Sequence, residues 1–235
     1  MNLFIKRNEL KYFISNSQAA MLTDKIQHIL DKDPHSKKEG YFIRSLYFDS
    51  HDDECLHEKM SGIMFRKKFR MRIYDFSDDI IKIEIKHKYN NQIFKETASI
   101  SRFSAKEIIS GNYSELLKYN NKILNKIYIE FSTKAYKPKV VIDYYREAYK
   151  WDFFNIRITV DRNLSSSISN FDIFSKNICS TPVILEGKQI LEIKYDNVLP
   201  DFIKQTLQID SFERYAISKY TLGRRFLKTQ PWQDN

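Results

Sequence analysis

The sequence is poor in the residues that interrupt secondary structure or crosslink small folds. Its 235 residues include five glycines, five prolines and two cysteines. So little glycine and proline argues against collagen-like, linker-rich and low-complexity architectures. Cys55 and Cys179 cannot build a disulfide framework, and neither lies in a zinc-binding pattern. We therefore expect a protein of the reducing cytoplasm.

Long apolar runs and known nucleotide motifs are also missing. No segment approaches the roughly 20 apolar residues that a membrane-spanning helix needs, and Met1 to Lys11 is charged too early for a secretory signal. No glycine-rich phosphate loop or dinucleotide fingerprint occurs. The expectation is a soluble chain without a membrane span, which could still work with a membrane-protein partner.

Aromatic and basic residues, in contrast, are abundant. The chain has 17 Phe, 15 Tyr and 42% hydrophobic residues, which is enough apolar surface for a large core. Its length suits one compact unit, so residues 1–235 are predicted to form a single domain. A formal net charge of +9 favours a polyanionic partner.

The positive charge follows a period of two along predicted strands. Between residues 66 and 74 four cations occupy alternate positions: Arg66, Lys68, Arg70 and Arg72. Side chains alternate across a strand, so one face is cationic and the other apolar. Similar faces recur at 7–11, 81–86, 156–161 and 191–195. Like charges at such positions lie only about 7 Å apart and repel, which indicates that an anion supplies the counter-charge.

Helix signals lie between and after these strands, at residues 15–30, 104–110, 113–119, 121–131, 201–207 and 218–227. The apolar strand faces need cover, so we expect the charged faces to turn inward and helices to pack outside. The predicted fold class is α+β, with an antiparallel sheet large enough to close.

In their order along the chain, these segments resemble the polyphosphate polymerase (VTC) domain of the triphosphate tunnel metalloenzyme, or CYTH-like, superfamily. The resemblance runs from Arg7 to about Arg225. It is carried by ELKY (9–12), RSLYFD (44–49), RMRIY (70–74), EIK (84–86), YYR (144–146), RITVD (157–161), LEIK (191–194) and SKY (218–220). It implies a closed antiparallel β-barrel tunnel of about eight strands, with helices packed on the outside and a C-terminal helix near the tunnel.

The resemblance also implies roles for individual residues. The catalytic phosphate ligands would be Lys11, Arg70, Arg72, Lys86, Arg146, Arg157 and Lys219. The substrate-binding residues would be Glu9, Glu84, Lys95, Tyr144, Lys194 and Ser218, of which Lys194 is assigned because it shares a strand face with Glu192. Glu192 would hold Mn²⁺ or Mg²⁺, hard cations that prefer oxygen ligands.

The expected activity is transfer of the terminal phosphate of ATP onto a growing chain of inorganic polyphosphate, so the expected partners are ATP and polyphosphate or pyrophosphate. Many hydrolytic and cyclase-type relatives begin with Glu-x-Glu-x-Lys, whereas Arg7 replaces the first Glu here. That exchange favours a polymerase, because a phosphate acceptor is already a nucleophile whereas water must be activated.

Two alternatives stay open: an inorganic or nucleoside triphosphatase in the same tunnel, and a polyphosphate-binding module without catalysis. Loss of turnover in a Glu192→Ala variant would separate an enzyme from a binding module. Nucleic acid is not expected as a partner, because the acidic residues on the same strand faces would repel its backbone.

Overall fold

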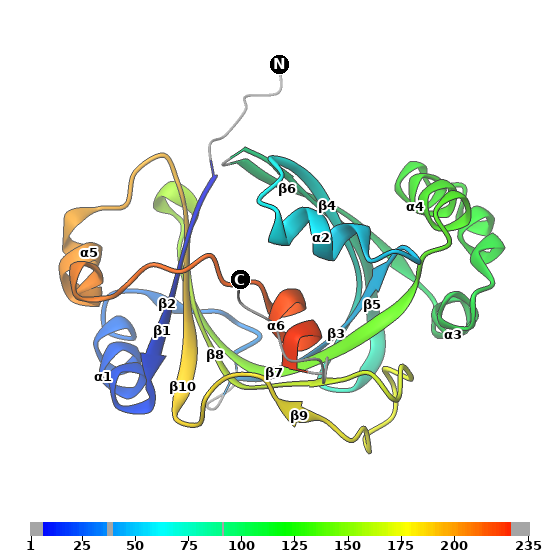
Figure 1. The fold of residues 1–235 in the computed structure, drawn as a ribbon. Helices are drawn as coiled ribbons and strands as arrows, with labels where there is room; N and C mark the ends of the chain where they lie inside the picture. Colours follow the sequence, from blue (N-terminus) through cyan, green and yellow to red (C-terminus); the bar gives the residue numbers. More distant parts are fainter. Residues whose placement is uncertain (1–6, 37–39, 91, 227–235) are drawn as a thin grey trace, which may run out of the picture.

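The computed structural model describes residues 7–36, 40–90 and 92–226, and one antiparallel sheet organises them (Figure 1). The sheet order is β1, β10, β8, β7, β3, β4, β5, β6. The bounds are β1 (Arg7–Ser15), β3 (Tyr41–Asp49), β4 (Phe65–Tyr74), β5 (Ser77–Tyr89), β6 (Gln92–Ile100), β7 (Lys137–Trp151), β8 (Ile156–Ser167) and β10 (Lys188–Asp196). Two short strands, β2 (Asp31–Lys32) and β9 (Thr181–Pro182), pair with β7 and β8.

The sheet curves strongly, but backbone hydrogen bonds do not close it. Strands β1 and β6 are its two edges, and no ladder joins them in the described part of the chain. The predicted closed barrel is therefore not confirmed. Charged side chains span the gap instead, since Lys86 Nζ of β5 lies 3.4 Å from Glu9 Oε1 of β1.

The apolar faces of β4 to β6 point outward, as the alternation predicted. Phe69 and Met71 of β4 are fully buried beneath α3 (Arg102–Ser110), the 3₁₀ segment η1 (Tyr113–Tyr119) and α4 (Lys122–Thr133). The ring centroids of Phe69 and Phe131 lie 5.3 Å apart. These helices form a layer outside the sheet (Figure 1).

A second helical layer covers the other end of the sheet. Helices α1 (Asn16–Ile26) and α5 (Asp201–Leu207) pack on β1, β10 and β8 around a core that includes Leu22, Ile203 and Leu191. The first helix begins with a capping box, in which Ser15 Oγ accepts a hydrogen bond from the backbone N–H of Gln18 and the Gln18 side chain accepts one from the N–H of Ser15. It ends at Ile26, before the predicted Leu30, because the chain turns there and buries Leu30.

Two further helices lie on the concave side of the sheet (Figure 1). The last helix, α6 (Lys219–Phe226), packs on the inner face of β7, where a Cβ at Gly223 would come within 2.3 Å of Ile142 Cδ1. Glycine is needed for this close approach. Helix α2 (Glu54–Met60), which the sequence did not predict, is held beside α6 by Asp49, whose Oδ2 accepts hydrogen bonds from Leu56 N–H and Tyr220 OH.

The remaining short helical segments are η2 (Phe153–Asn155) and η3 (Ile209–Ser211). Across the described ranges, no helix has the length and apolarity required to cross a lipid bilayer.

Candidate functional site

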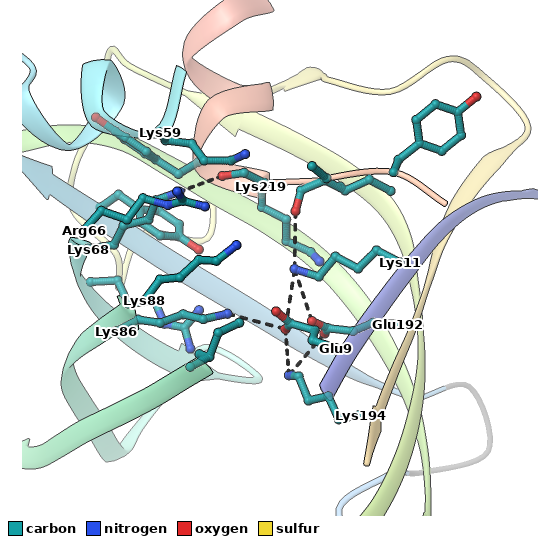
Figure 2. A pocket seen from close by; sticks show the side chains of 18 of the residues that line it. Glu9, Lys11, Lys59, Arg66, Lys68, Lys86, Lys88, Glu192, Lys194 and Lys219 are labelled. Atoms are coloured by element: carbon teal, nitrogen blue, oxygen red, sulfur yellow. Dashed lines mark hydrogen bonds and ion pairs between the residues drawn. The ribbon is translucent and has the colours of Figure 1, made fainter. Parts of the chain in front are cut away.

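The concave side of the sheet encloses a cavity of about 690 Å³ (Figure 2). Twelve basic side chains line it: Lys11, Lys59, Arg66, Lys68, Arg70, Arg72, Lys86, Lys88, Arg146, Lys194, Arg214 and Lys219. Among the described residues, two acidic ones, Glu9 and Glu192, belong to the same lining. The lining therefore has a formal excess of ten positive charges.

Strand register brings these side chains to one surface. The even positions of β4 and β5 point inward from one side, and β1 and β10 supply the other side. Lys11 of β1 pairs in register with Glu192 of β10, and Glu9 pairs with Lys194. Because both pairs share the inner face, acids and bases alternate along this wall.

The two carboxylates form a compact group with two lysines (Figure 2). Lys11 Nζ lies 3.5 Å from Glu9 and 3.3 Å from Glu192, and Lys194 Nζ lies 3.6 Å and 3.3 Å from the same carboxylates. Burial alone would raise the pKa of Glu192, but Lys194 and Lys11 outweigh it and hold that pKa well below its usual range. Glu192 is thus an ionised carboxylate inside the cavity.

The opposite wall, formed by β4 and β5, carries more cations than the nearby carboxylates can compensate. Burial and the neighbouring cations lower the pKa of Lys68 to about 7, and burial with Lys11 and Lys194 lowers that of Lys86 to about 7 despite Glu9. Burial, together with nearby positive charge, also depresses the pKa of Lys59 and Lys88. This repulsion is unfavourable in the isolated protein, and a bound anion would relieve it.

Glu84, which was predicted to bind substrate, lies on the same face of β5 as Lys86, but it is fully buried and is not part of the lining. Its carboxylate is fully buried, in contact with Arg70 Nε, and lies 2.9 Å from Lys95 Nζ. Although burial opposes ionisation, Arg70, Arg72 and Lys95 lower the pKa of Glu84 to about 2. Glu84 therefore orients the Arg70 guanidinium. Lys95 pairs with Glu84 and is not part of the lining.

Arg157 is the other predicted phosphate ligand that lies outside the lining. Its Nη2 is 2.8 Å from Asp33 Oδ2 and 3.2 Å from Tyr41 OH. It shares the inner face of the sheet with Lys194, its register partner, but the tertiary contact with Asp33 draws it away.

Asp161, which is not itself part of the lining, organises two predicted ligands that are, Arg146 and Lys219. This fully buried carboxylate accepts hydrogen bonds from Arg146 at 2.6 Å and 2.8 Å, and Lys219 Nζ lies 2.6 Å away. Burial would raise the pKa of Asp161, but Arg146 and Lys219 lower it to about 2. Nearby, Arg72 donates a hydrogen bond of 2.9 Å to Tyr144 OH.

The structure thus gathers most of the predicted residues around one cavity: Glu9, Lys11, Arg70, Arg72, Lys86, Tyr144, Arg146, Glu192, Lys194, Ser218 and Lys219. It also adds lining residues that were not predicted as site residues. Arg66, Lys68 and Lys88 continue the alternation of their strands, so a signal for them was present in the sequence. Lys59 on α2 and Arg214 in the loop before α6 had no such signal in the sequence. The side chain of Arg7 lies outside the described part of the structure.

A divalent cation fits this donor set only together with a phosphate ligand. The described residues contain no group of three or more His, Cys, Asp or Glu side chains placed to hold a metal ion. However, Mg²⁺ commonly binds one or two carboxylates and completes its shell with substrate phosphates and water. Glu192, with Glu9 beside it, offers such oxygen donors to the cavity.

Residues 6–228 match the VTC domain family. The chain belongs to that family. The predicted membership is confirmed, and the match covers almost the whole sequence. Comparison with curated protein sequences finds no significant match for this VTC domain.

Solved structures show the same fold at low sequence identity. A Hippeastrum protein described as an adenylyl cyclase with a dominant triphosphatase activity is 15% identical, with a TM-score of 0.57, and the match covers 94% of the VTC domain and 95% of that chain. Proteins described as candidate adenylate cyclases from Bacillus halodurans (13% identity, TM-score 0.51, coverage 91% and 96%) and Vibrio parahaemolyticus (11%, 0.51, 93% and 97%) are also similar. At these identities the likeness concerns the fold alone.

Proposed function

We propose that this VTC domain synthesises inorganic polyphosphate, transferring the terminal phosphate of ATP to a growing chain in the basic cavity. The observation that carries the proposal is the excess of ten positive charges in the lining. A bound triphosphate brings roughly four negative charges, so much of that excess is left for a second phosphate chain. A cavity that binds a single small anion would not need so large an excess of positive charge.

The arrangement suits phosphoryl transfer, in which alignment and charge neutralisation do most of the work. Arg70 is oriented by Glu84, and Arg146 by Asp161, so both guanidinium groups are held in place before substrate binds. Planar guanidinium groups match pairs of phosphate oxygens, whereas Lys86 offers a compact charge. These side chains would align donor and acceptor phosphates end to end.

Mn²⁺ or Mg²⁺, held by Glu192 and phosphate oxygens, would supply further neutralisation of charge on the transferred group. Tyr144 would lie toward the nucleotide. In this proposal the cavity acts as a tunnel whose β1–β6 seam is bridged by side chains such as Glu9 and Lys86. The whole chain would act as one domain in the cytoplasm.

The test is incubation of purified protein with ATP and Mn²⁺, following ADP release and the formation of acid-labile polymer on a gel. Glu192→Gln is the diagnostic variant, because it keeps the size of the side chain and removes its charge. Glu186→Gln, at an exposed position away from the cavity, is the matched control. Polymer that is lost only in Glu192→Gln supports the proposal.

Hydrolysis is the second candidate function, favoured by the triphosphatase activity of the Hippeastrum protein with the same fold. In the assay above, free phosphate without polymer would assign this function. Tight polyphosphate binding without turnover would instead leave a binding module.

A further inference from the structure

We propose that Ser218 and Lys68 form a nucleophilic pair in which the Ser218 hydroxyl accepts the terminal phosphoryl group of a bound triphosphate. The inference rests on the proposed function only in requiring that a triphosphate occupies the cavity. It adds a covalent phosphoserine to a site whose other side chains act by charge and alignment.

The two side chains meet from distant parts of the chain. Lys68 Nζ lies 2.8 Å from Ser218 Oγ, across 150 residues of sequence, and both residues line the cavity (Figure 2). The backbone N–H of Thr221 donates to the same Oγ at 3.3 Å. These contacts fix the hydroxyl at the start of α6, at the edge of the space that a phosphate chain would occupy.

Lys68 differs from four of the other lysines in the lining. Lys11, Lys86 and Lys194 each contact a carboxylate, and so does Lys219. In the described ranges no carboxylate pairs with Lys68, whose hydrogen-bond partner there is Ser218.

The surroundings of Lys68 favour its neutral form. Its charged neighbours are Lys86, Lys59, Lys11 and Arg66, and the Tyr220 ring lies 5.4 Å from Nζ. Burial and these cations bring its pKa to about 7, so a large fraction of the amine is neutral near neutral pH. A bound triphosphate adds negative charge that raises this pKa, whereas burial and the neighbouring cations continue to oppose protonation. A neutral amine can accept the Ser218 proton, as in other Ser–Lys nucleophiles.

Other serines that cap helices in this protein lack such a partner. Ser15 at α1 and Ser101 at α3 accept the expected backbone hydrogen bonds, and no lysine contacts either hydroxyl in the described structure. Helix capping therefore accounts for the Thr221 contact, but it does not require Lys68.

The start of α6 also suits the product. The first N–H groups of a helix have no partner within the helix, and they favour negative charge. Phosphoserine at residue 218 would place its phosphate beside these groups and near Lys219, the first residue of α6.

The chemical step balances within the site. A bond forms between Ser218 Oγ and the terminal phosphorus, and the bond from that phosphorus to the bridging oxygen breaks. The electron pair of the broken bond stays on the leaving diphosphate, and the hydroxyl proton passes to Lys68 Nζ. Transfer of the same phosphoryl group to a phosphate acceptor would regenerate the hydroxyl.

The experiment treats the purified protein with a phosphatase, removes the phosphatase, and adds [γ-³²P]ATP with Mn²⁺ in a rapid acid quench. Brief heating of the quenched sample in strong acid hydrolyses polyphosphate, whereas a phosphoserine ester survives it. We expect acid-stable label on the peptide that contains Ser218, with none in Ser218→Ala and at least tenfold slower labelling in Lys68→Met. Ser218→Thr keeps a hydroxyl and the cap, and it should retain measurable label.

Lys106→Met, at an exposed position of α3 outside the cavity lining, is the matched control for Lys68→Met; it should label within about threefold of the natural protein. Polymer or phosphate formation at the full rate with no label on Ser218 would overturn the inference and leave the proposed function standing. Label on Ser218 without polymer would support this inference and contradict the proposed synthesis of polyphosphate. Equal labelling of Ser218→Ala at another residue would also overturn the inference.

Discussion

Replacing Glu84 by Gln should reveal how much the cavity wall depends on one buried charge. The carboxylate is fully buried between Arg70 and Lys95, and its pKa is about 2 instead of 4.5. At about 1.4 kcal/mol for each pKa unit, this difference corresponds to roughly 3 kcal/mol of stabilisation. Lys95 is half exposed and its attraction is screened, so we expect Glu84→Gln to lower the free energy of unfolding by about 2–3 kcal/mol at pH 7.

Urea denaturation followed by circular dichroism measures this change, and its pH dependence tests the cause. The folded-state pKa of Glu84 is depressed, so its stabilisation is complete above about pH 5 and disappears as the pH falls toward 2. The difference between the natural protein and Glu84→Gln should shrink over the same range. Gln retains the volume and polar atoms of Glu, so the measurement isolates the charge.

Glu96→Gln is the matched control on the neighbouring strand. Glu96 pairs with His87 and Lys126 on the outer face and is partly exposed, so its loss should cost less than about 1 kcal/mol. A change below 1 kcal/mol for Glu84→Gln at pH 7, or an equal change at pH 7 and pH 2.5, would refute the idea that Glu84 acts as a buried counter-charge.

Three further predictions concern the cavity. Glu192→Gln should slow metal-dependent ADP release by about a hundredfold or more. The Kd for triphosphate in EDTA, measured by calorimetry, should stay within a few-fold of that of the natural protein. Turnover equal to that of the natural protein would exclude Glu192 as a metal ligand. Inorganic triphosphate at a hundred times its Kd should stabilise the protein by about 2.7 kcal/mol, raising Tm by roughly 5–11 °C, and added NaCl should reduce the gain; a salt-independent shift would argue against charge-based binding. Lys68→Met should stabilise the empty protein at pH 6 by about 0.5–2 kcal/mol. A lysine whose folded-state pKa is depressed to about 7 destabilises the protein fully below that pH, and this penalty disappears as the pH rises toward the ordinary value of 10.5, so the gain should fade toward pH 10. Destabilisation by Lys68→Met at pH 6 would contradict this.

Much of the site was accessible from the sequence because strands impose a period of two. Arg70, Arg72 and Lys86 fall on the inner faces of β4 and β5, as their spacing predicts, and the intervening Phe69 and Met71 are buried outside. The same rule placed Lys68 on the cationic face, and it would have added Lys88 had the second strand been extended past residue 86. The family resemblance supplied Tyr144 and Ser218, which alternation alone does not identify.

Contacts between distant residues decided the rest. The sequence by itself determined which side chains share a strand face, because neighbouring residues set that through local backbone geometry. It could not show that β1 and β6 are unpaired in the described structure, that Arg157 pairs with Asp33, or that Glu84 is fully buried beside Arg70. Nor could it bring Lys68 to Ser218. These outcomes depend on how the sheet curves and where α2 and α6 pack, and such long-range packing leaves no periodic signal in the chain.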